Sequence, residues 1–554
     1  MLAFPIIISV APTVTGGCDP VVLPKRGLQT GPQGAVCRCN ESACDFIAPL
    51  GQVPKAGYVA YATSLQIATE RLSRSEGLLE PTPTTSATHL VTVDPTQHFQ
   101  TMKGFGAAFT DAATLGYNTL TPAAQANLLR SYWGEGGLRY SIGRIPIGAS
   151  DFSTSVYSYN DEQFASPGVE DVNLTHFSVE IDEELGKLPL IRSAQELAST
   201  AAHTAVGAIA FTSVNSAPGL SFFGSCWAPP PWMTTKNTTL NAELRDQPGG
   251  PIHQAYARYL SRFISEYAKK GVDVWAITGG NEPAGNTGKW QDLKFTAAGQ
   301  RDFIKTDLGP MLAKNNPSCE LMILDDQRVH LPDWADTVLG DPEAAKYVQG
   351  IGVHWYAATE DTFPFWRSMT SAHDKHPDVY ILGTEACEGF LPWSQGPFPG
   401  DWERGERYAL DVINDANNWA SGWTDWNFCL DLSGGPNWAG NICDAPILVG
   451  TEHSERAAPG SVSVFYKQPM FYYFGHIAAF VAPGATRLGV SSTASGLLGS
   501  ALISAAFLTP DGTLVVVVVM NRDGSAHEAA IGVPKGFLNV QLPPHSIRTY
   551  VVAL

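Results

Sequence analysis

The 554-residue sequence predicts an α/β protein built around a closed barrel of eight parallel strands, with β-rich segments on both sides of the barrel. Two observations lead to this fold class. Between about residues 100 and 430, short apolar segments alternate with segments of helical periodicity, which is the pattern of a parallel sheet covered by helices. After about residue 475, short β-rich runs separated by Gly and Pro turns replace the alternation. Eight β/α units that close on themselves form a TIM barrel, whose active sites lie at the carboxyl ends of the strands.

Eight segments have the length and apolar character of barrel strands. In chain order they are Gly104–Phe109, Tyr140–Ile147, Leu220–Ser225, Val272–Thr278, Leu321–Leu324, Ile351–Trp355, Val379–Thr384 and Gly422–Asn427. Helical patterns separate them. In Ile252–Lys270, apolar and aromatic side chains recur at helical spacing, and the following Gly271 is typical of the end of a helix.

The β-rich ends of the chain are expected to form one β-sandwich beside the barrel. Its candidate strands are Tyr58–Ala62, His89–Val93, Val515–Val519, Ala529–Val533 and Arg548–Val552. Because the first two precede the barrel and the others follow it, the sandwich would join the two ends of the chain.

Composition and charge exclude several classes of protein. Apolar residues make up 44% of the chain and charged residues 16%, which is too apolar for a disordered protein. Lys and Arg number 35 against 53 Asp and Glu, and the net charge of −18 repels phosphate groups. Nucleic acid is therefore not expected as a partner, and contact with a membrane surface would be apolar or mediated by another protein. No apolar run reaches the roughly 18 residues that cross a bilayer, so we expect a soluble protein.

The amino terminus indicates export. Residues 1–17 contain the apolar stretch Leu2–Ala11 and are expected to be a signal peptide, although a basic start is lacking; a disordered tail or a misassigned start is the alternative. The secretory pathway, with a lysosome, a vacuole or the exterior as the destination, is the expected location. Three sequons, at Asn40, Asn173 and Asn237, would then be glycosylation sites.

The cysteines support the same compartment. Cys18, Cys37, Cys39 and Cys44 lie close together and allow three disulfide pairings. Zinc is the competing interpretation, but the segment has no histidine and lacks paired two-residue gaps. The remaining cysteines are Cys226, Cys319, Cys387, Cys429 and Cys443. Because five is an odd number, at least one of them is expected to be a buried free thiol.

Two glutamates follow predicted strands. Val272–Thr278 leads into Asn281-Glu282-Pro283, and Val379–Thr384 delivers Glu385, so both carboxylates are expected at one mouth of the barrel. Paired carboxylates are what glycoside cleavage requires: a separation of about 5 Å gives a nucleophile and retention, and about 6.5–9.5 Å admits a water and gives inversion. For a single glutamate, a solvated surface charge is the alternative.

Aromatic and polar residues at other strand ends are typical of a sugar site. Trp227 and Trp426 offer flat faces to a pyranose ring, with His354 and Tyr356 as polar neighbours, whereas core packing is the alternative for each tryptophan. Arg144 and Asp151 flank the end of the second strand. They could form an ion pair that holds the loops, or Asp151 could bind a hydroxyl group.

Most of these residues, Trp227 excepted, belong to a series of nine short motifs that runs along most of the chain. The motifs are KGFGAAFTDAA (103–113), RIPIGASDFS (144–153), ITGGNEPAG (277–285), LDDQR (324–328), GVHWY (352–356), TEACEG (384–389), GWTDWN (422–427), GGPNW (434–438) and YKQPMFY (466–472). In sequence and in order they resemble those of the glucosylceramidases of glycoside hydrolase family 30, from Cys18 onward.

The resemblance implies a retaining β-glucosidase that hydrolyses glucosylceramide, with Glu282 as acid/base and Glu385 as nucleophile, and with no metal or cofactor. It implies glucose-binding roles for Asp151, Trp227, Asn281, Trp426 and Asn441, with Tyr356 near the nucleophile and Arg144 and His354 in support. A saposin-like activator at a membrane surface is the partner that it implies.

The resemblance also implies the domain organisation. Disulfides Cys18–Cys37 and Cys39–Cys44 would stabilise a small β domain. The expected boundaries are 18–48 plus 428–460 for this small domain, 49–99 plus 476–554 for the sandwich, and 100–427 plus 461–475 for the catalytic barrel.

Some positions depart from the family pattern. The loop Ala284–Lys294, which includes Trp290, is shorter, Cys226 stands where proline is expected, and Ser150 stands where cysteine is expected. The alternatives to a glucosylceramidase are a secreted β-1,6-glucanase or xylan-active enzyme of the same family, and a barrel that binds glycans or lipids without turnover.

Overall fold

The computed structural model describes residues 18–25, 27, 29, 31–161, 170–204, 219–286, 288–356, 366–494 and 502–554. The expected signal peptide, residues 1–17, lies outside the described residues. Within the described part of the chain, no helix is both long enough and apolar enough to cross a membrane.

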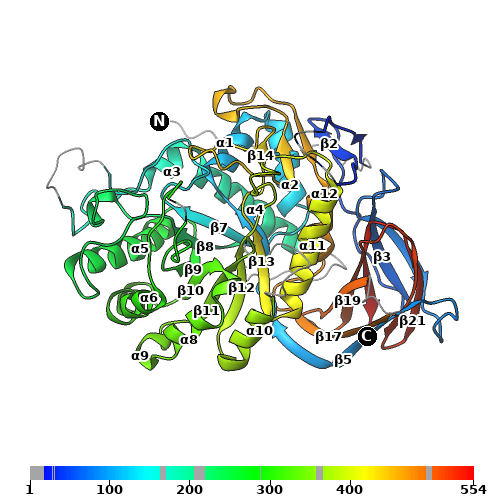
Figure 1. Ribbon diagram of the computed structural model, residues 1–554. Helices are drawn as coiled ribbons and strands as arrows, with labels where there is room; N and C mark the ends of the chain where they lie inside the picture. Colours follow the sequence, from blue (N-terminus) through cyan, green and yellow to red (C-terminus); the bar gives the residue numbers. More distant parts are fainter. Residues whose placement is uncertain are drawn as a thin grey trace.

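The centre of the molecule is a closed barrel of eight parallel strands (Figure 1). The strands are β6 (Gly104–Ala108), β7 (Ile142–Ile147), β8 (Ser221–Cys226), β9 (Val274–Thr278), β10 (Glu320–Gln327), β11 (Gly350–His354), β12 (Tyr380–Glu385) and β13 (Ala420–Asp425). All eight predicted strands are confirmed, with ends that shift by at most three residues. Glycines allow the strands to pack closely: a Cβ at Gly106 of β6 would overlap the carbonyl oxygen of Ile142 in β7.

Helices surround the barrel (Figure 1). They are α1 (Asp111–Thr119), α2 (Pro122–Trp133), α3 (Glu180–Glu184), α4 (Lys187–Thr204), α5 (Pro251–Lys269), α6 (Ala297–Phe303), α7 (Gly309–Asn315), α8 (Asp333–Leu339), α9 (Pro342–Ala345), α10 (Trp366–Lys375), α11 (Trp402–Asn417) and α12 (Pro469–Ala478). Helix α5 confirms the predicted helix. Its aromatic stripe from Tyr256 to Tyr267 is buried, and the chain turns away at Gly271, where φ is 83°.

The two ends of the chain share one nine-stranded sheet, seen in blue and red beside the barrel in Figure 1. In spatial order its strands are β21 (Gly536–Leu542), β20 (His527–Val533), β5 (His89–Thr101), β17 (Thr486–Ala494), β18 (Leu502–Leu508), β19 (Leu514–Asn521), β22 (Ser546–Ala553), β3 (Gly57–Ser64) and β4 (Ser73–Leu78). The sheet curls over an apolar core, and its edges meet where Glu80 and Phe537 exchange backbone hydrogen bonds of 2.9 and 2.8 Å. The predicted sandwich is therefore confirmed as one unit made from both ends.

A small five-stranded sheet packs beside the barrel. Its order is β1 (Pro20–Val21), β2 (Val36–Asn40), β16 (Val464–Lys467), β15 (Ile447–Val449) and β14 (Leu430–Asp431). Disulfides join Cys18 to Cys37 and Cys39 to Cys44. The structure corrects the expected boundary, because β16 falls within the segment 461–475 that was expected in the barrel. It pairs antiparallel with β2, and the buried Lys467 at its end contacts Asp45 at 3.3 Å.

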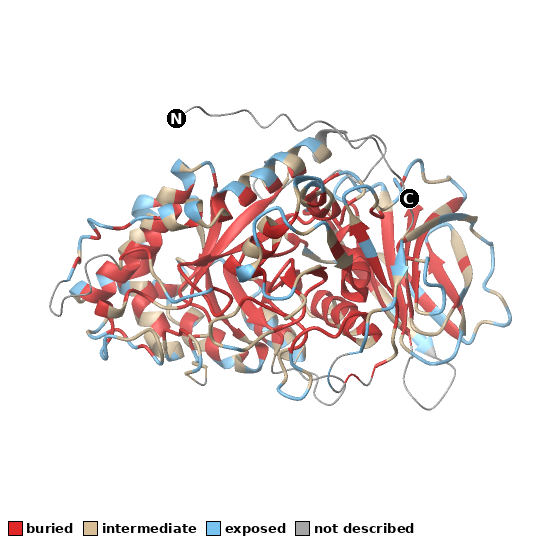
Figure 2. Ribbon diagram, turned by 90° about the horizontal axis from the view of Figure 1, so that it is seen from above, coloured by how far each residue is buried: buried red, intermediate tan, exposed pale blue. Residues whose placement is uncertain are grey.

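Burial follows this architecture. Viewed from above, the barrel strands are buried, and the exposed residues lie on the outer faces of helices, in loops and on parts of the sandwich strands such as β4 and β5 (Figure 2). Two of the sequon asparagines, Asn173 and Asn237, are exposed. Asn40 is half-buried, and its side-chain oxygen accepts hydrogen bonds from the backbone N–H groups of Ser42 and Ala43, both at 2.9 Å.

Candidate active site

The two predicted glutamates converge at the carboxyl end of the barrel. Glu385 is the last residue of β12, and Glu282 lies in the turn that leaves β9. One carboxylate oxygen of each glutamate and one ring nitrogen of His354, the last residue of β11, all lie within 4.8 Å of one another. Residues that are far apart in sequence meet here because parallel barrel strands end on the same face.

Glu282 is held in an unusual backbone conformation. Its φ is 46°, in the left-handed region that costs energy for a residue with a Cβ. The backbone N–H of Glu282 donates to the carbonyl of Asp325 at 2.9 Å, which fixes the turn. Its side chain is 13% exposed, and Oε1 accepts a hydrogen bond from Gln327 Nε2 at 3.0 Å and lies 3.2 Å from His354 Nδ1. The carboxylate is therefore oriented and still reachable from solvent.

Glu385 is held more tightly and is only 7% exposed. Its Oε2 forms an ion pair with Arg144 Nη1, and its Oε1 accepts a hydrogen bond from the hydroxyl of Tyr356 at 2.9 Å. Burial raises the pKa of Glu385, the positive charges of His354 and Arg144 oppose that rise, and the negative charge of Glu282 adds to it. The nearby carboxylate of Glu282 therefore disfavours ionisation of Glu385, whereas Arg144 and His354 favour it.

A fully buried carboxylate, Asp325 in β10, anchors the two cationic residues. It accepts hydrogen bonds from Arg144 Nη2 at 3.0 Å and from the hydroxyls of Ser225 and Thr278 at 2.7 and 2.8 Å, and it lies 3.1 Å from His354 Nε2. Burial alone would raise the pKa of Asp325, but Arg144 and His354 lower it well below its ordinary value. Asp325 therefore stays charged and fixes both cations beneath the glutamates.

His354 is the positive centre of the cluster. Burial alone would lower its pKa, but the charge of Glu385 and the hydrogen bonds to Asp325 and Glu282 raise the pKa to about 10. Both ring nitrogens then carry protons at neutral pH and have no lone pair to offer a metal. Glu282, His354 and Glu385 are close enough to share a metal ion, but this protonation does not suit one.

Asp151 and Asn441 form a second polar group beside the glutamates. Asn441 Nδ2 donates to Asp151 Oδ2 at 2.7 Å, and burial, followed by the charge of Glu385, raises the pKa of Asp151 to about 8. Within the described chain, Asp151 Oδ1 and Asn441 Oδ1 are buried and have no hydrogen-bond partner. Buried oxygens of this kind are suited to accept hydrogen bonds from the hydroxyls of a bound ligand.

Of the two alternatives for Asp151, the ion pair with Arg144 is wrong. Arg144 pairs with Glu385 and Asp325, and its Nη2 also donates to Asn281 Oδ1 at 2.7 Å. Asp151 instead accepts a hydrogen bond from the side-chain amide of Asn441, which lies 290 residues away in sequence.

The two predicted tryptophans pack against each other. The rings of Trp227 and Trp426 stack with centroids 4.8 Å apart at 12°, and the residues are 1% and 2% exposed. The guanidinium of Arg144 lies over both rings, 4.9 and 5.4 Å from their centroids. They form an apolar wall that excludes water from the Arg144–Glu385 pair and thereby strengthens it.

Sequence reasoning assigned no role to Asp325, although this residue directly follows the predicted strand Leu321–Leu324. The observed strand β10 continues to Gln327 through a bulge in which Leu324 and Asp325 have φ values of 66° and 60°. The strand-end rule that found the two glutamates also points to Asp325, but its role depends on contacts with Arg144 and His354, which belong to other strands.

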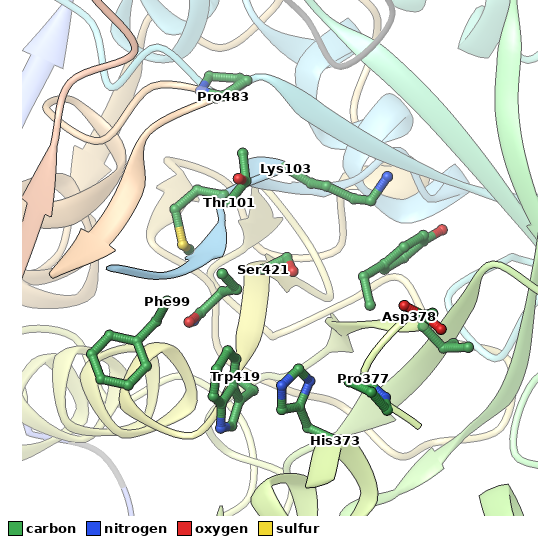
Figure 3. A pocket seen from close by; sticks show the side chains of 14 residues that line it. Phe99, Thr101, Lys103, His373, Pro377, Asp378, Trp419, Ser421 and Pro483 are labelled. Carbon is green, nitrogen blue, oxygen red and sulfur yellow. The ribbon is translucent and has the colours of Figure 1, made fainter. Parts of the chain in front are cut away.

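A cavity of about 580 Å³ lies at the opposite, amino-terminal end of the barrel, between it and the sandwich (Figure 3). Phe99, Lys103, His373 and Trp419 are among its lining residues, and the rings of His373 and Trp419 stack with centroids 3.6 Å apart. None of the predicted site residues lines this cavity.

Comparison with known proteins agrees with this architecture. The model described as "Glycosyl hydrolase family 30 TIM-barrel domain" matches residues 102–481, and the model described as "Glycosyl hydrolase family 30 beta sandwich domain" matches residues 484–550. The chain is 38% identical to the protein named putative glucosylceramidase 4 of Caenorhabditis elegans, over 94% of this chain and 93% of that protein. It is also 38% identical to the lysosomal acid glucosylceramidase of Mus musculus, over 94% of each chain.

A solved structure has the same fold. The structure of SrfJ from Salmonella typhimurium is similar with a TM-score of 0.75 at 24% identity, covering 89% of this chain and 99% of that one.

Proposed function

Because the chain belongs to glycoside hydrolase family 30 and is a glycoside hydrolase, we propose that it is a retaining β-glucosidase that hydrolyses glucosylceramide to glucose and ceramide. The observation that carries the stereochemical part is the approach of the two carboxylates to within 4.8 Å. Retaining enzymes have carboxyl groups about 5–5.5 Å apart, and inverting enzymes need about 6.5–9.5 Å to admit a water.

Glu385 is the proposed nucleophile and Glu282 the proposed acid/base. Arg144 and Tyr356 each bind one oxygen of Glu385, so its carboxylate is fixed for attack on the anomeric carbon. Glu282 is the more exposed of the two, which suits a group that protonates the leaving oxygen and later deprotonates an incoming water. In the first step the C–O bond to the leaving group breaks as the Glu385–glucose bond forms.

In the second step Glu282 acts as a base instead of an acid. Once Glu385 is esterified its negative charge is gone, so Glu282 loses its like-charged neighbour, and its carboxylate can stay ionised and act as the base. It removes a proton from water, which attacks the anomeric carbon and releases Glu385. Before the first step His354 is positively charged and offsets the negative charge of the glutamates.

Glucose recognition is proposed for the residues around this pair. Asp151 and Asn441 each offer a buried oxygen without a partner, and sugar hydroxyls would supply the missing hydrogen bonds. Asn281 is held by Arg144 beside the glutamates. The stacked Trp227 and Trp426 form the apolar wall of the proposed sugar site.

The ceramide part of the proposal rests on the relatives. Two of them carry glucosylceramidase in their names, and one is named for the lysosome. We propose a lysosomal or vacuolar location for this chain, reached through the secretory pathway. The net charge of −18 opposes direct contact with anionic lipids, which favours delivery of the lipid by a saposin-like activator.

A mechanism-based label tests the reaction. A 2-fluoro glucoside with a good leaving group should form a glucosyl ester that turns over slowly, and peptide mapping should find it on Glu385. A label on another residue contradicts the assignment. The anomer released first from an aryl β-glucoside, followed by NMR, should be β; first release of α-glucose would mean inversion.

Substrate assays test the specificity. Turnover of glucosylceramide, β-1,6-glucan and aryl xyloside should be compared at acidic and neutral pH, with glucosylceramide expected to give the highest kcat/KM. A higher value on β-1,6-glucan or xyloside would favour the glucanase or xylan-active alternative. Binding without turnover would favour a non-catalytic barrel.

A further inference from the structure

Two cysteines beside the glutamates have no part in the reaction described above. Cys387 follows Glu385 by two residues, in the irregular segment after β12, and Cys443 follows Asn441 by two residues, in the irregular segment between β14 and β15. The two residues are 1% and 3% exposed. Their side chains point toward each other: the S–H of Cys387 donates to Cys443 Sγ at 3.0 Å.

This pair is unlike the other free cysteines. Cys226, Cys319 and Cys429 each direct the thiol to a backbone carbonyl, of Ala228, Glu320 and Ala113 respectively. Among the described cysteines outside the two disulfides, Cys387 and Cys443 are the pair whose sulfurs contact each other.

A bond between them needs little movement. A disulfide has its sulfurs about 2.05 Å apart, so these sulfurs would approach by about 1 Å. Neither cysteine lies in a helix or strand, and irregular backbone can accommodate such a shift. The chain already contains Cys18–Cys37 and Cys39–Cys44, which indicates a compartment where disulfides persist. We propose that Cys387 and Cys443 form a third disulfide, which links the segment of the nucleophile to the segment that carries Asn441.

The oxidant would be an external disulfide of the glutathione or protein type. One cysteine thiolate attacks a sulfur of that disulfide and releases a thiol, and the second cysteine attacks the resulting mixed disulfide and releases the other thiol. Two protons pass to the two released thiols, and the two electrons reduce the S–S bond of the oxidant.

Cys443 is the expected entry point. Residues 437–442, just before it, are half-buried or exposed, so opening of this segment would uncover Cys443, whereas Cys387 is held next to a barrel strand. Burial raises the pKa of both thiols, which makes exchange slow in the closed fold. The bond is therefore expected to form during folding, before the segment closes.

The cross-link would secure the sugar site. Asn441 holds Asp151 at 2.7 Å, and the Tyr356 hydroxyl that binds Glu385 also lies 3.5 Å from Cys387 Sγ. The disulfide would hold these two sets of contacts together. This consequence rests on the proposed function, whereas formation of the bond does not.

Thiol counting tests the bond without any assay of activity. The full-length protein is refolded with excess oxidised glutathione, denatured, and alkylated without reduction. Of the five cysteines outside the two N-terminal disulfides, three should be alkylated. Digestion before aspartate yields peptides 378–400 and 431–443, each with one cysteine of the pair, and these should be found joined, two hydrogens lighter than their sum. Alkylation of all five cysteines would overturn the proposal.

Two matched variants test the consequence. Cys443→Val should lower the Tm by several degrees and raise the KM for an aryl glucoside several-fold relative to the oxidised wild type, with a smaller change in kcat. Cys429→Val removes a buried thiol outside the pair and should keep the joined peptides and the wild-type KM. A reductant should shift the wild type toward the Cys443→Val values and leave that variant unchanged. Equal responses of the two proteins to reductant would contradict a role for the bond in the sugar site, and an inactive protein with joined peptides would contradict only the proposed function.

Discussion

The two ends of the barrel both place charges beside aromatic rings, but they balance those charges differently. At the amino-terminal end, Lys103 Nζ pairs with one carboxylate, Glu320, at 3.2 Å. The same ammonium group lies over the rings of Tyr380 and Trp275, 3.9 and 4.9 Å from their centroids. One cation meets one anion, and the aromatic faces complete its surroundings.

The carboxyl-terminal end has more anions than cations. Arg144 and His354 are shared among Glu282, Glu385 and Asp325. Such an excess of buried negative charge opposes folding unless a proton or a ligand compensates for it. A proton held by one of two neighbouring carboxylates is also what the proposed reaction needs, because one carboxyl group then donates the proton while the other attacks. We therefore expect the amino-terminal end, where the charges balance, to contribute to stability, and the carboxyl-terminal end, where they do not, to carry the proposed reaction. In TIM barrels generally, the carboxyl-terminal face holds the active site and the amino-terminal face contributes to stability.

The largest effect is expected from removing the nucleophilic charge. Glu385→Gln keeps the shape of the side chain but cannot attack the anomeric carbon, so kcat/KM on glucosylceramide should fall on the order of 10⁴-fold. Glu320→Gln makes the same chemical change at the amino-terminal end and should leave kcat unchanged. A comparable loss of activity in the two variants would contradict the proposed difference between the two ends of the barrel.

The next effect depends on the leaving group. Glu282→Gln removes the proton donor, so kcat on glucosylceramide should fall by about 10²- to 10⁴-fold. An aryl glucoside with an acidic phenol needs no protonation, and its first chemical step should stay close to the wild-type rate in pre-steady-state measurements. An equal loss on both substrates would argue against an acid role for Glu282.

A smaller effect concerns stability and pH. The pKa of Asp151 is about 8 in the folded protein and is expected near its ordinary value of 3.8 in the unfolded chain. Between these pH values the folded state binds more protons, so the free energy of unfolding falls as the pH rises from about 4 to about 8. When Tm is measured against pH, it should decrease less between about pH 4 and about pH 8 in Asp151→Asn than in the wild type. Asp273→Asn, at an exposed position, should follow the wild type. Identical pH profiles for the wild type and Asp151→Asn would contradict the prediction.

The smallest effect is expected at the balanced end. Lys103→Met keeps an apolar chain over Tyr380 and Trp275 but leaves Glu320, whose side chain is 30% exposed, to be hydrated. The free energy of unfolding should fall by about 1 kcal/mol in urea denaturation, with KM and kcat unchanged. A large loss of activity with normal stability would mean that the two ends are coupled.

The fold and the central pair of glutamates could be predicted because both depend on local pattern. Barrel strands are short apolar runs, and a polar residue that follows such a run within a few positions lies at the carboxyl end of the barrel. That rule identified Glu282 and Glu385 without any knowledge of their surroundings. The sandwich was predicted from a different local pattern: similar β-rich runs occur on both sides of the barrel, so the two ends of the chain were expected to form one unit.

Features that depend on tertiary contacts could not be predicted in this way. The bulge that carries Asp325 contains consecutive residues with positive φ and no glycine to signal them. The strand β16 is a four-residue run next to a helix, and only its pairing with β2 identifies its sheet. The contacts of Arg144 with Asp325 and of Cys387 with Cys443 likewise join segments that are far apart in sequence, and no pattern of residue spacing predicts them.

The closing of the sandwich by both ends of the chain constrains synthesis on the ribosome. Strand β5 pairs with β17 and β20, and β3 pairs with β22, so the first sandwich strands emerge long before their partners. Until translation is complete, these strands present open edges that invite association with other nascent chains. Loss of β22 would leave β3 and β19 without the strand that lies between them, so this late strand protects both from pairing with other chains.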